Sequence, residues 1–326
     1  MKKNIAIIMG GYSSEAGISL KSGMVVASHL DATKYNTYPI HILKDKWVYI
    51  DSNNEEFALD KNDFSLHLGT SKITFDCVFN AIHGTPGEDG KLLAYLELIG
   101  IKHTSAPFYQ MAVTFNKRDT LSIVKKYGIP TAKSIYMNEG DFIDVKNIIE
   151  TVGLPCFIKP NNAGSSYGIT KAHTEAEIYS GIEKAFKEDI ELLIESFLEG
   201  TEVSVGVIQY KEETMVLPIT EIVSENDFFD YEAKYEGKSE EITPARITEA
   251  QEKKVKKMAL KVYQILNMSG FSRSEFIIVD GTPHFLEINT VPGLTEESIL
   301  PQQAHQANIS LAELFENAIE MALKKV

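Results

Sequence analysis

The chain has 326 residues, a formal net charge of −14, 44% hydrophobic residues and 24% charged residues. This composition is typical of a soluble globular protein, and the length is enough for two or three domains with buried cores. The acidic balance excludes a broad nucleic-acid or anionic-membrane surface, which would be basic, but it is compatible with a local basic pocket for phosphate.

The cysteines and the apolar runs indicate a cytoplasmic protein. Cys77 and Cys156 each lie in an apolar, strand-like run, which favours buried free thiols over a disulfide. The first apolar run, at 5–9, is too short for the core of a signal peptide. No stretch approaches the ~20 apolar residues that a membrane span requires. We therefore expect no membrane insertion and no nucleic-acid partner.

The start of the chain indicates a parallel-sheet α/β domain. A buried-type strand at 4–9 leads into Gly10-Gly11-Tyr12-Ser13-Ser14-Glu15, and a helix follows to about residue 30. Loops at the carboxyl ends of parallel strands carry ligand sites, so Glu15 is a candidate site residue. A first-turn acid that complements the helix dipole is the alternative.

A second glycine-rich loop is predicted at the same sheet edge. Further strands are predicted at 34–43, 47–50 and 73–82. The last of these strands ends in the loop 83–90, which contains three glycines and a proline and is followed by a helix at 92–99. His83 opens this loop and is a second candidate site residue. A structural histidine with satisfied hydrogen bonds is the alternative.

The character of the sequence changes near residue 105, where we place the first domain boundary. The next elements are predicted to be helices at 108–127 and 144–152 and strands at 132–136, 156–159 and 191–194. The strand that ends at Lys159 leads into a loop of small residues at 161–168. Such a loop can cradle phosphate oxygens, and a lysine beside it adds charge. The spacing is not that of a P-loop, and a flexible hairpin tip is the alternative.

A hinge and a lid are predicted next. A short acidic connection at 195–200 joins two strands, and the backbone of such a hinge suits an adenine ring. The segment 225–240 has no regular pattern but carries four aromatic residues within 228–235. Long irregular segments are usually functional or disordered, and the aromatic content argues against disorder. We therefore predict a lid that orders over substrate.

The stretch 271–294 has the densest grouping of chemically active residues. Two strands are joined by the turn signal Asp280-Gly281. Simple alternation of side chains predicts that Arg273 and Glu275 share one face, and that Phe285, Glu287 and Asn289 share one face. Two carboxylates, a carboxamide and a guanidinium on rigid strands could hold a divalent cation and the anion that it serves. The solvated face of an amphipathic hairpin is the alternative.

Capping signals open the helices on either side of this hairpin. Thr248-x-x-Gln251 precedes a helix that ends near residue 266, and Ser310-x-x-Glu313 opens the last helix. An apolar stripe on the last helix indicates core packing or an oligomer contact, and it consists of Leu311, Leu314, Phe315, Ile319 and Leu323.

Six motifs, taken in order, resemble those of the D-alanine–D-alanine ligase family in the ATP-grasp superfamily. They are Gly10-Gly11-x-Ser-x-Glu15, His83-Gly-x-x-Gly-Glu88-Asp89-Gly, Lys159-Pro-x-x-x-Gly-Ser165-Ser166, Tyr231-Glu-Ala-Lys234-Tyr235, Arg273-x-Glu275 and Glu287-x-Asn289-Thr-x-Pro-Gly293. Each motif alone is weak, but the ordered set is specific and runs from end to end. The resemblance implies an α/β fold class, with an N-terminal parallel-sheet α/β domain at 1–105. A two-lobed ATP-grasp fold, α+β in its lobes, follows at 106–196 and 197–326.

The resemblance also implies an activity. ATP would phosphorylate the carboxylate of one D-alanine, and the amine of a second D-alanine would displace phosphate to form D-alanyl-D-alanine for peptidoglycan synthesis. ATP is then the cosubstrate, with two Mg²⁺ or Mn²⁺ ions. Members of this family are commonly homodimers, so a homodimer is expected.

Site residues follow from the resemblance position by position. The catalytic residues would be Glu15, Ser165, Tyr235, Arg273 and Gly293. The substrate-binding residues would be His83, Ser298 and Ile299, and the metal ligands Glu275, Glu287 and Asn289. The ATP-binding residues would be Lys117, Lys159, Ser166, Glu195, Phe197, Leu198, Glu202 and Lys234.

Three positions depart from the family pattern. Ala16-Gly17 follows Glu15 where a basic residue is more common, and Ile299 replaces the commoner Leu. Glu275 replaces the usual Asp, and its longer arm shifts the metal position. The sequence Tyr231-Glu-Ala-Lys-Tyr is the form found in dipeptide-forming members, which favours D-alanine in both substrate positions.

Two other hypotheses for the function compete with this one. One is an ATP-grasp ligase that acts on other carboxylates and amines, which the paired Glu15 and His83 loops disfavour. The other is a nucleotide-binding regulatory protein with an inactive site. Such a protein would lack the metal carboxylates or Arg273, and all of them are present.

Overall fold

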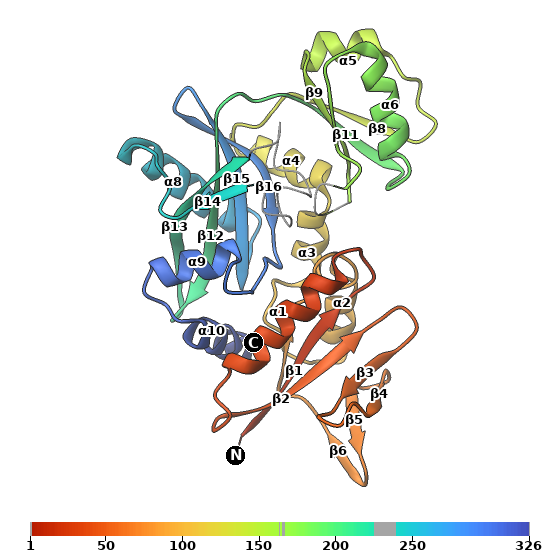
Figure 1. Ribbon diagram of the computed structural model, residues 1–326, viewed down its shortest axis with the longest axis vertical. Coiled ribbons are helices and arrows are strands. Elements are labelled where there is room, and N and C mark those ends of the chain that lie inside the picture. Colours follow the sequence, from red (N-terminus) through yellow and green to blue (C-terminus); the bar gives the residue numbers. More distant parts are fainter. Residues whose placement is uncertain (1, 163, 165–166, 225–238, 326) are drawn as a thin grey trace.

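The structure is a computed structural model that describes residues 2–162, 164, 167–224 and 239–325. Figure 1 shows three sheets that follow one another along the chain, each packed against helices. We call the second sheet with its helices the small lobe, and the third sheet with its helices the large lobe.

The first sheet has seven strands in the order β6-β5-β4-β3-β2-β1-β7. These strands are β1 (Lys3–Gly10), β2 (Tyr35–Ile42), β3 (Trp47–Ile50), β4 (Glu56–Asp60), β5 (Ser65–Leu68), β6 (Ser71–Ile73) and β7 (Cys77–Asn80). β1 is parallel to β2 and β7, and β3 to β6 extend the sheet as an antiparallel meander. The helices are α1 (Ala16–His29), which packs on β1, and α2 (Lys91–Leu98).

The strand expected at 73–82 is two strands. Its first residue belongs to β6, which pairs with β5, whereas β7 pairs with β1. β4 and β5 were not expected from the sequence. The parallel part of the sheet is therefore limited to β2, β1 and β7, whose carboxyl ends carry the two glycine-rich loops.

The small lobe is an antiparallel sheet in the order β10-β9-β11-β8. Its elements are β8 (Ser134–Asn138), α5 (Val145–Val152), β9 (Cys156–Pro160), β10 (Thr170–Ala172), α6 (Glu175–Ala185) and β11 (Glu191–Ser196). The core lies between this sheet and the two helices, and it includes Cys156, Ile158, Ile182 and Ile194. β9 and β11 carry Lys159 and Glu195 respectively.

The large lobe is an antiparallel sheet in the order β14-β13-β12-β15-β16. Its elements are β12 (Thr201–Tyr210), β13 (Glu213–Ser224), β14 (Ser239–Ile242), α8 (Glu249–Ile265), β15 (Phe271–Val279), β16 (Thr282–Asn289), α9 (Ile299–Gln306) and α10 (Leu311–Lys324). The capping box predicted at Thr248 and Gln251 is confirmed, and so is the Ser310 cap of α10.

A β-bulge in the β15–β16 hairpin makes one prediction wrong. Glu275 lies opposite Glu287, but Phe276 lies opposite Phe285, so Leu286 is the extra residue. Phe285 therefore points into the core, where its ring centroid lies 5.7 Å from that of Phe276. It does not share the face of Glu287, because one extra residue resets the alternation of side chains.

The helix expected at 108–127 is two helices, α3 (Phe108–Phe115) and α4 (Lys117–Lys126). Asn116 between them has extended backbone, and its side chain accepts a hydrogen bond from the Asp119 N–H at 2.9 Å. An N-cap of this kind begins a new helix. The break places Lys117 in the first turn of α4. α4 lies between the large lobe and the small lobe (Figure 1).

The apolar stripe of α10 is core packing. α10 lies between the first sheet and the large lobe and contacts α1, β7 and β12. Leu314, Phe315 and Ile319 are fully buried, and the ring centroids of Phe315 and Phe79 are 5.8 Å apart. Cys77, in the same core, and Cys156 are both buried and free, as expected. Among the described residues, no helix is both long and apolar enough to cross a bilayer.

We predict that Phe315→Ala lowers the free energy of unfolding by about 3–5 kcal/mol, because it leaves a cavity between the first sheet and α10. Urea unfolding followed by circular dichroism would measure this. Phe142→Ala is the control, because Phe142 is 87% exposed, and its effect should stay within about 0.5 kcal/mol. Equal losses in the two variants would contradict the packing described here.

Candidate active site

Two acids oppose each other across the hairpin. Glu275 on β15 lies directly opposite Glu287 on β16, and Arg273 lies opposite Asn289. Like charges in this arrangement repel, so nearby cations must offset them. Arg273 Nη1 lies 2.5 Å from Glu275 Oε1, and Lys117 Nζ lies 3.5 Å from Glu287 Oε2. The hairpin thus brings together the four polar residues that the sequence singled out.

Arg273 is a fixed cation whose side chain is 11% exposed. Its Nη1 also donates to Ser204 Oγ on β12 at 2.9 Å, and Ser204 is fully buried. Burial alone would lower the pKa of the guanidinium, but Glu275, followed by Glu287 and Glu241, holds that pKa above its usual value. Arg273 therefore keeps its charge and has little freedom to move.

Lys159 is a second cation with little exposure, contributed by the small lobe, and its side chain is 17% exposed. Its Nζ donates to Glu195 Oε2 at 2.9 Å. Burial would lower the pKa of the ammonium group, but Glu195, followed by Glu287 and Glu202, holds that pKa above its usual value. Because Glu287 and Glu202 belong to the large lobe, Lys159 lies where the two lobes face each other.

The hinge after β11 offers polar groups that suit a heterocyclic ring. Glu195 Oε1 is buried and has no hydrogen-bond partner among the described residues. The Phe197 N–H donates to Pro155 O at 3.3 Å, so it is already paired. The Leu198 N–H makes no hydrogen bond within the described part of the chain. An acceptor and a donor are therefore available at Glu195 and Leu198.

The two glycine-rich loops of the first domain meet. Ser13 Oγ donates to His83 O at 3.0 Å. A Cβ at Gly84 would lie 3.5 Å from Glu15 Oε2, and a Cβ at Gly164 would lie only 2.6 Å from that atom. Glycine at 164 thus permits the loop of the small lobe to approach the Glu15 carboxylate closely. Glu15 and His83 lie at one sheet edge, as the sequence predicted.

His83 links three segments of the chain. Its Nδ1 lies 2.7 Å from Val291 O, and its Nε2 lies 3.2 Å from Ser22 Oγ. A carbonyl only accepts, so Nδ1 carries the proton and the Ser22 hydroxyl donates to Nε2. Ser22 Oγ in turn accepts from the Leu294 N–H at 3.3 Å. Burial lowers the pKa of His83, which keeps the ring neutral. These contacts support the alternative that His83 is a structural histidine with satisfied hydrogen bonds.

Glu88 has a role that the sequence reasoning missed. Its carboxylate accepts hydrogen bonds from the N–H groups of Gly84 at 3.0 Å, Thr290 at 3.1 Å and Val291 at 3.4 Å. Burial, with the nearby Glu15 charge, raises the pKa of Glu88 to about 7 although these hydrogen bonds oppose the shift. Glu88 therefore ties the His83 loop to the end of β16. An acid within a glycine-rich loop was the available signal.

A third set of groups surrounds the start of α9. Ser298 precedes this helix, and its Oγ lies 2.8 Å from Thr295 Oγ1. A Cβ at Gly293 would lie 2.6 Å from Ser298 Oγ, so glycine allows the backbone to lie beside that hydroxyl. Ile299 is buried and packs with Ile222.

Gln303, which the sequence reasoning did not single out, holds α9 against the sheet. Its side chain is fully buried, and its Oε1 accepts from the Gly206 N–H at 2.9 Å. Its Nε2 donates to Ser204 O at 2.9 Å and to Thr220 Oγ1 at 3.0 Å. Because Ser204 Oγ also accepts a hydrogen bond from Arg273, the same residue holds both α9 and the guanidinium.

Some predicted site residues lie outside the described residues. These are Ser165, Ser166, Lys234 and Tyr235, together with 225–238 of the expected lid. Their roles stay predictions.

The hairpin residues fit a hard divalent cation. Across the described ranges, no group of three or more histidine, cysteine or acidic side chains is assembled for a metal. The donor set is instead the opposed carboxylates of Glu275 and Glu287 with the Asn289 carboxamide. Oxygen donors of this kind suit Mg²⁺ or Mn²⁺, and a cation between the carboxylates would relieve their repulsion.

Comparisons with known proteins agree on one family. Residues 4–106 match the family model for the D-ala D-ala ligase N-terminus, and residues 123–320 match that for the C-terminus. The chain is 65% identical over 321 residues to the D-alanine–D-alanine ligase of Flavobacterium johnsoniae, covering 98% of this chain and 99% of that protein.

Solved structures resemble the whole chain. The crystal structure of the VanG D-Ala:D-Ser ligase from Enterococcus faecalis has a TM-score of 0.87 at 31% identity, covering 99% of this chain and 100% of that chain. The D-alanine–D-alanine ligase of Bacillus anthracis complexed with ATP has a TM-score of 0.79 at 25% identity, covering 98% of this chain and 97% of that chain. The α/β fold class, with an ATP-grasp architecture, is therefore confirmed.

The raised pKa of Glu88 predicts a pH dependence of stability. Between about pH 4.5 and pH 7 the unfolded carboxyl is ionised while the folded one keeps its proton, so this group makes folding less favourable as pH rises. We expect Glu88→Gln to remove that contribution. The free energy of unfolding of the wild type, relative to the variant, should then fall between about pH 5 and pH 7, as measured by urea titration. The exposed Glu55→Gln variant is the control, and parallel profiles for wild type and Glu88→Gln would contradict the assignment.

Proposed function

The chain belongs to the D-alanine–D-alanine ligase family, and we propose how its own residues carry out the reaction of that family. The reaction is the ATP-dependent ligation of two D-alanine molecules to D-alanyl-D-alanine for the cell wall. The observation that carries the proposal is the opposed pair Glu275 and Glu287, approached by Arg273, Lys117 and Lys159 from three different elements.

ATP binds between the two lobes in this proposal. The adenine ring lies at the hinge, where Glu195 Oε1 accepts from the exocyclic amine and the Leu198 N–H donates to a ring nitrogen. Phe197 contributes its side chain, since its N–H is already paired with Pro155 O. Glu202 holds the ribose hydroxyls. This arrangement is supported by the unpaired oxygen of Glu195, which needs a donor at that point.

The triphosphate extends from the hinge toward the hairpin. Lys117 and Lys159 neutralise its charge, and Ser166 and Lys234 contact the terminal phosphate. Glu275, Glu287 and Asn289 hold two Mg²⁺ or Mn²⁺ ions. When bound, such ions neutralise phosphate oxygens and orient them for transfer. The carboxylate of the first D-alanine accepts the phosphoryl group, which yields an acyl phosphate.

The second step joins the two amino acids. Glu15 pairs with the ammonium group of the first D-alanine, next to Ser165, Tyr235 and His83. Ser298 and the Ile299 backbone bind the carboxylate of the second D-alanine, whose amine attacks the acyl phosphate. Arg273 and the Gly293 N–H stabilise the oxyanion that develops. The lid at 225–240 excludes water, which would hydrolyse the acyl phosphate.

Assembly and location complete the proposal. We infer domains at 1–105, 106–196 and 197–326, with the substrate-binding loops in the first and the ATP site between the other two. The protein is proposed to work as a cytoplasmic homodimer. Sedimentation equilibrium would test the dimer.

The decisive experiment is mass analysis of the product formed from ATP, Mg²⁺ and D-alanine. We expect D-alanyl-D-alanine with one phosphate released per peptide bond, and no product after EDTA treatment. Parallel reactions add D-lactate or D-serine, the latter because one structural neighbour is a D-Ala:D-Ser ligase. A dominant depsipeptide or D-alanyl-D-serine product would overturn the choice of second substrate. ATP hydrolysis without ligation would favour a different acceptor.

We predict that Arg273→Ala lowers kcat by about 10²–10³-fold, as removal of one oxyanion donor typically does. Ser204→Ala is the matched control, because it removes a hydrogen-bond partner of Arg273 while keeping the guanidinium. Its loss in kcat should be much smaller. Thermal denaturation of both variants checks that the fold persists. Normal turnover in a folded Arg273→Ala enzyme would rule out the oxyanion role.

A further inference from the structure

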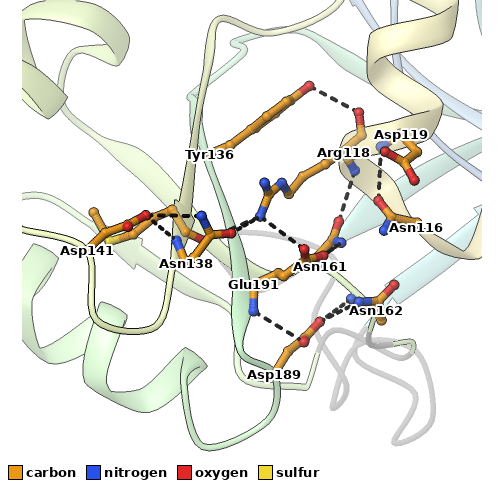
Figure 2. Close-up of polar contacts among 11 residues, drawn as sticks. Asn116, Arg118, Asp119, Tyr136, Asn138, Asp141, Asn161, Asn162, Asp189 and Glu191 are labelled. Carbon is orange, nitrogen blue, oxygen red and sulfur yellow. Dashed lines mark hydrogen bonds and ion pairs between the residues drawn. The ribbon is translucent and has the colours of Figure 1, made fainter.

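A polar network joins the start of α4 to the small lobe (Figure 2). The first N–H groups of a helix have no partner within it. Here the Lys117 N–H donates to Asn161 O at 3.4 Å, and the Arg118 N–H donates to Asn161 Oδ1 at 2.9 Å. Asn116 Oδ1 accepts the next N–H, that of Asp119, at 2.9 Å. Two of these three amides are therefore capped by one residue from another part of the chain.

Asn161 is well placed to act as a spacer, by which we mean a residue that holds the start of α4 at a fixed distance from β9. It is fully buried and follows the end of β9, two residues after Lys159. Its Nδ2 donates to Glu191 Oε2 at 2.7 Å, and its N–H donates to Glu191 O at 2.9 Å. Asn161 is thus fixed to β11 through its side chain and its backbone, and every one of its polar atoms is used.

Arg118 reinforces the same junction. Its Nη1 donates to Asn138 Oδ1 at 2.9 Å and lies 3.7 Å from Glu191 Oε1. The guanidinium lies over the Tyr136 ring, 5.0 Å from the centroid. Arg118 therefore attaches α4 to the small lobe, whereas the preceding residue, Lys117, reaches Glu287 in the large lobe.

We propose that Asn161 is a positioning residue that sets the separation of Lys117 and Lys159. Lys159 is two residues away along the chain, and the backbone of Lys117 is hydrogen-bonded to Asn161 directly. The contact with Lys117 uses the main-chain O of Asn161, and the buried carboxamide accepts from the next N–H of α4, that of Arg118. Because the carboxamide also donates to Glu191, it fixes the first turn of α4, which carries one ammonium group, relative to β9, which carries the other. The inference rests on the proposed function, in which both lysines bind the triphosphate.

If Asn161 served only as a structural cap of α4, a different experimental result would be expected. Loss of a cap loosens α4 and lowers stability without selectivity among ligands. Loss of a spacer weakens binding of the phosphates. The hinge groups Glu195 Oε1 and Leu198 N–H are not bonded to Asn161 in the described part of the chain, so they remain able to bind adenosine. Affinity for ADP compared with affinity for adenosine therefore separates the two roles.

The first test compares Asn161→Ala with Asn147→Ala. Asn147 is an exposed asparagine on α5 of the same lobe and has no place in the proposed site. Isothermal titration calorimetry with Mg²⁺-ADP and with adenosine would measure both affinities. For Asn161→Ala we expect the Kd of ADP to rise about 5- to 50-fold, the cost of losing a buried hydrogen-bonded group, with adenosine affinity unchanged. Asn147→Ala should bind both ligands as the wild type does.

An exchange of the amide and the acid between positions 161 and 191 provides a rescue experiment. Asn161→Asp places a second carboxylate 2.7 Å from Glu191 Oε2, where the wild type has the Nδ2 donor. We expect weakened ADP binding in this variant. Adding Glu191→Gln restores a donor opposite the new carboxylate, so the double variant should recover most of the ADP affinity. The KM for ATP should follow the same order, while the KM for D-alanine stays within about twofold.

The outcomes distinguish this inference from the function on which it rests. Wild-type protein that neither binds ADP nor forms dipeptide would overturn the proposed function. Normal dipeptide synthesis together with unchanged ADP affinity in Asn161→Ala would overturn the spacer alone. Equal losses for ADP and adenosine, or no recovery in the double variant, would also overturn it, because a structural cap explains those results.

Discussion

The opposition of two carboxylates on neighbouring strands is the constraint on which the rest of the site depends. Glu275 and Glu287 would repel each other on a bare hairpin, so the chain must bring positive charge to them. Arg273 comes from the same hairpin, Lys117 from α4 and Lys159 from β9. The small lobe, the large lobe and α4 therefore converge on one charged position, and that position is suited to a polyanion with its metal ions.

Much of the fold and the outline of the site could be predicted from the sequence because the signals are local. Alternating and buried apolar runs predict β1, β3 and the hairpin strands, and the capping residues predict the starts of α8 and α10. The glycine-rich loops predict where Glu15 and His83 meet. The predicted position of Phe285 was wrong because a β-bulge arises from the pairing of two strands, and the sequence of either strand alone does not reveal it.

The supporting residues could not be predicted, because their partners are distant in sequence. The Glu88 carboxylate accepts hydrogen bonds from the N–H groups of Thr290 and Val291, about 200 residues away, as well as from Gly84 in its own loop, and Gln303 binds backbone on β12. Asn161 holds amides of α4 and a carboxylate on β11. Each is an ordinary polar residue until the fold brings these groups to it. The residues proposed to contact ligands belong to recognisable motifs, whereas Gln303 and Asn161, which support them, do not stand out in the sequence.

The position of α10 has a consequence for how the protein is made. Ile5, Ile7 and Phe79 of the first sheet share a core with Leu314 and Phe315. During synthesis, one side of β1 and β7 leaves the ribosome long before the helix that buries it. α1 covers part of this face, but the part that packs against Leu314 and Phe315 stays uncovered until α10 has been translated.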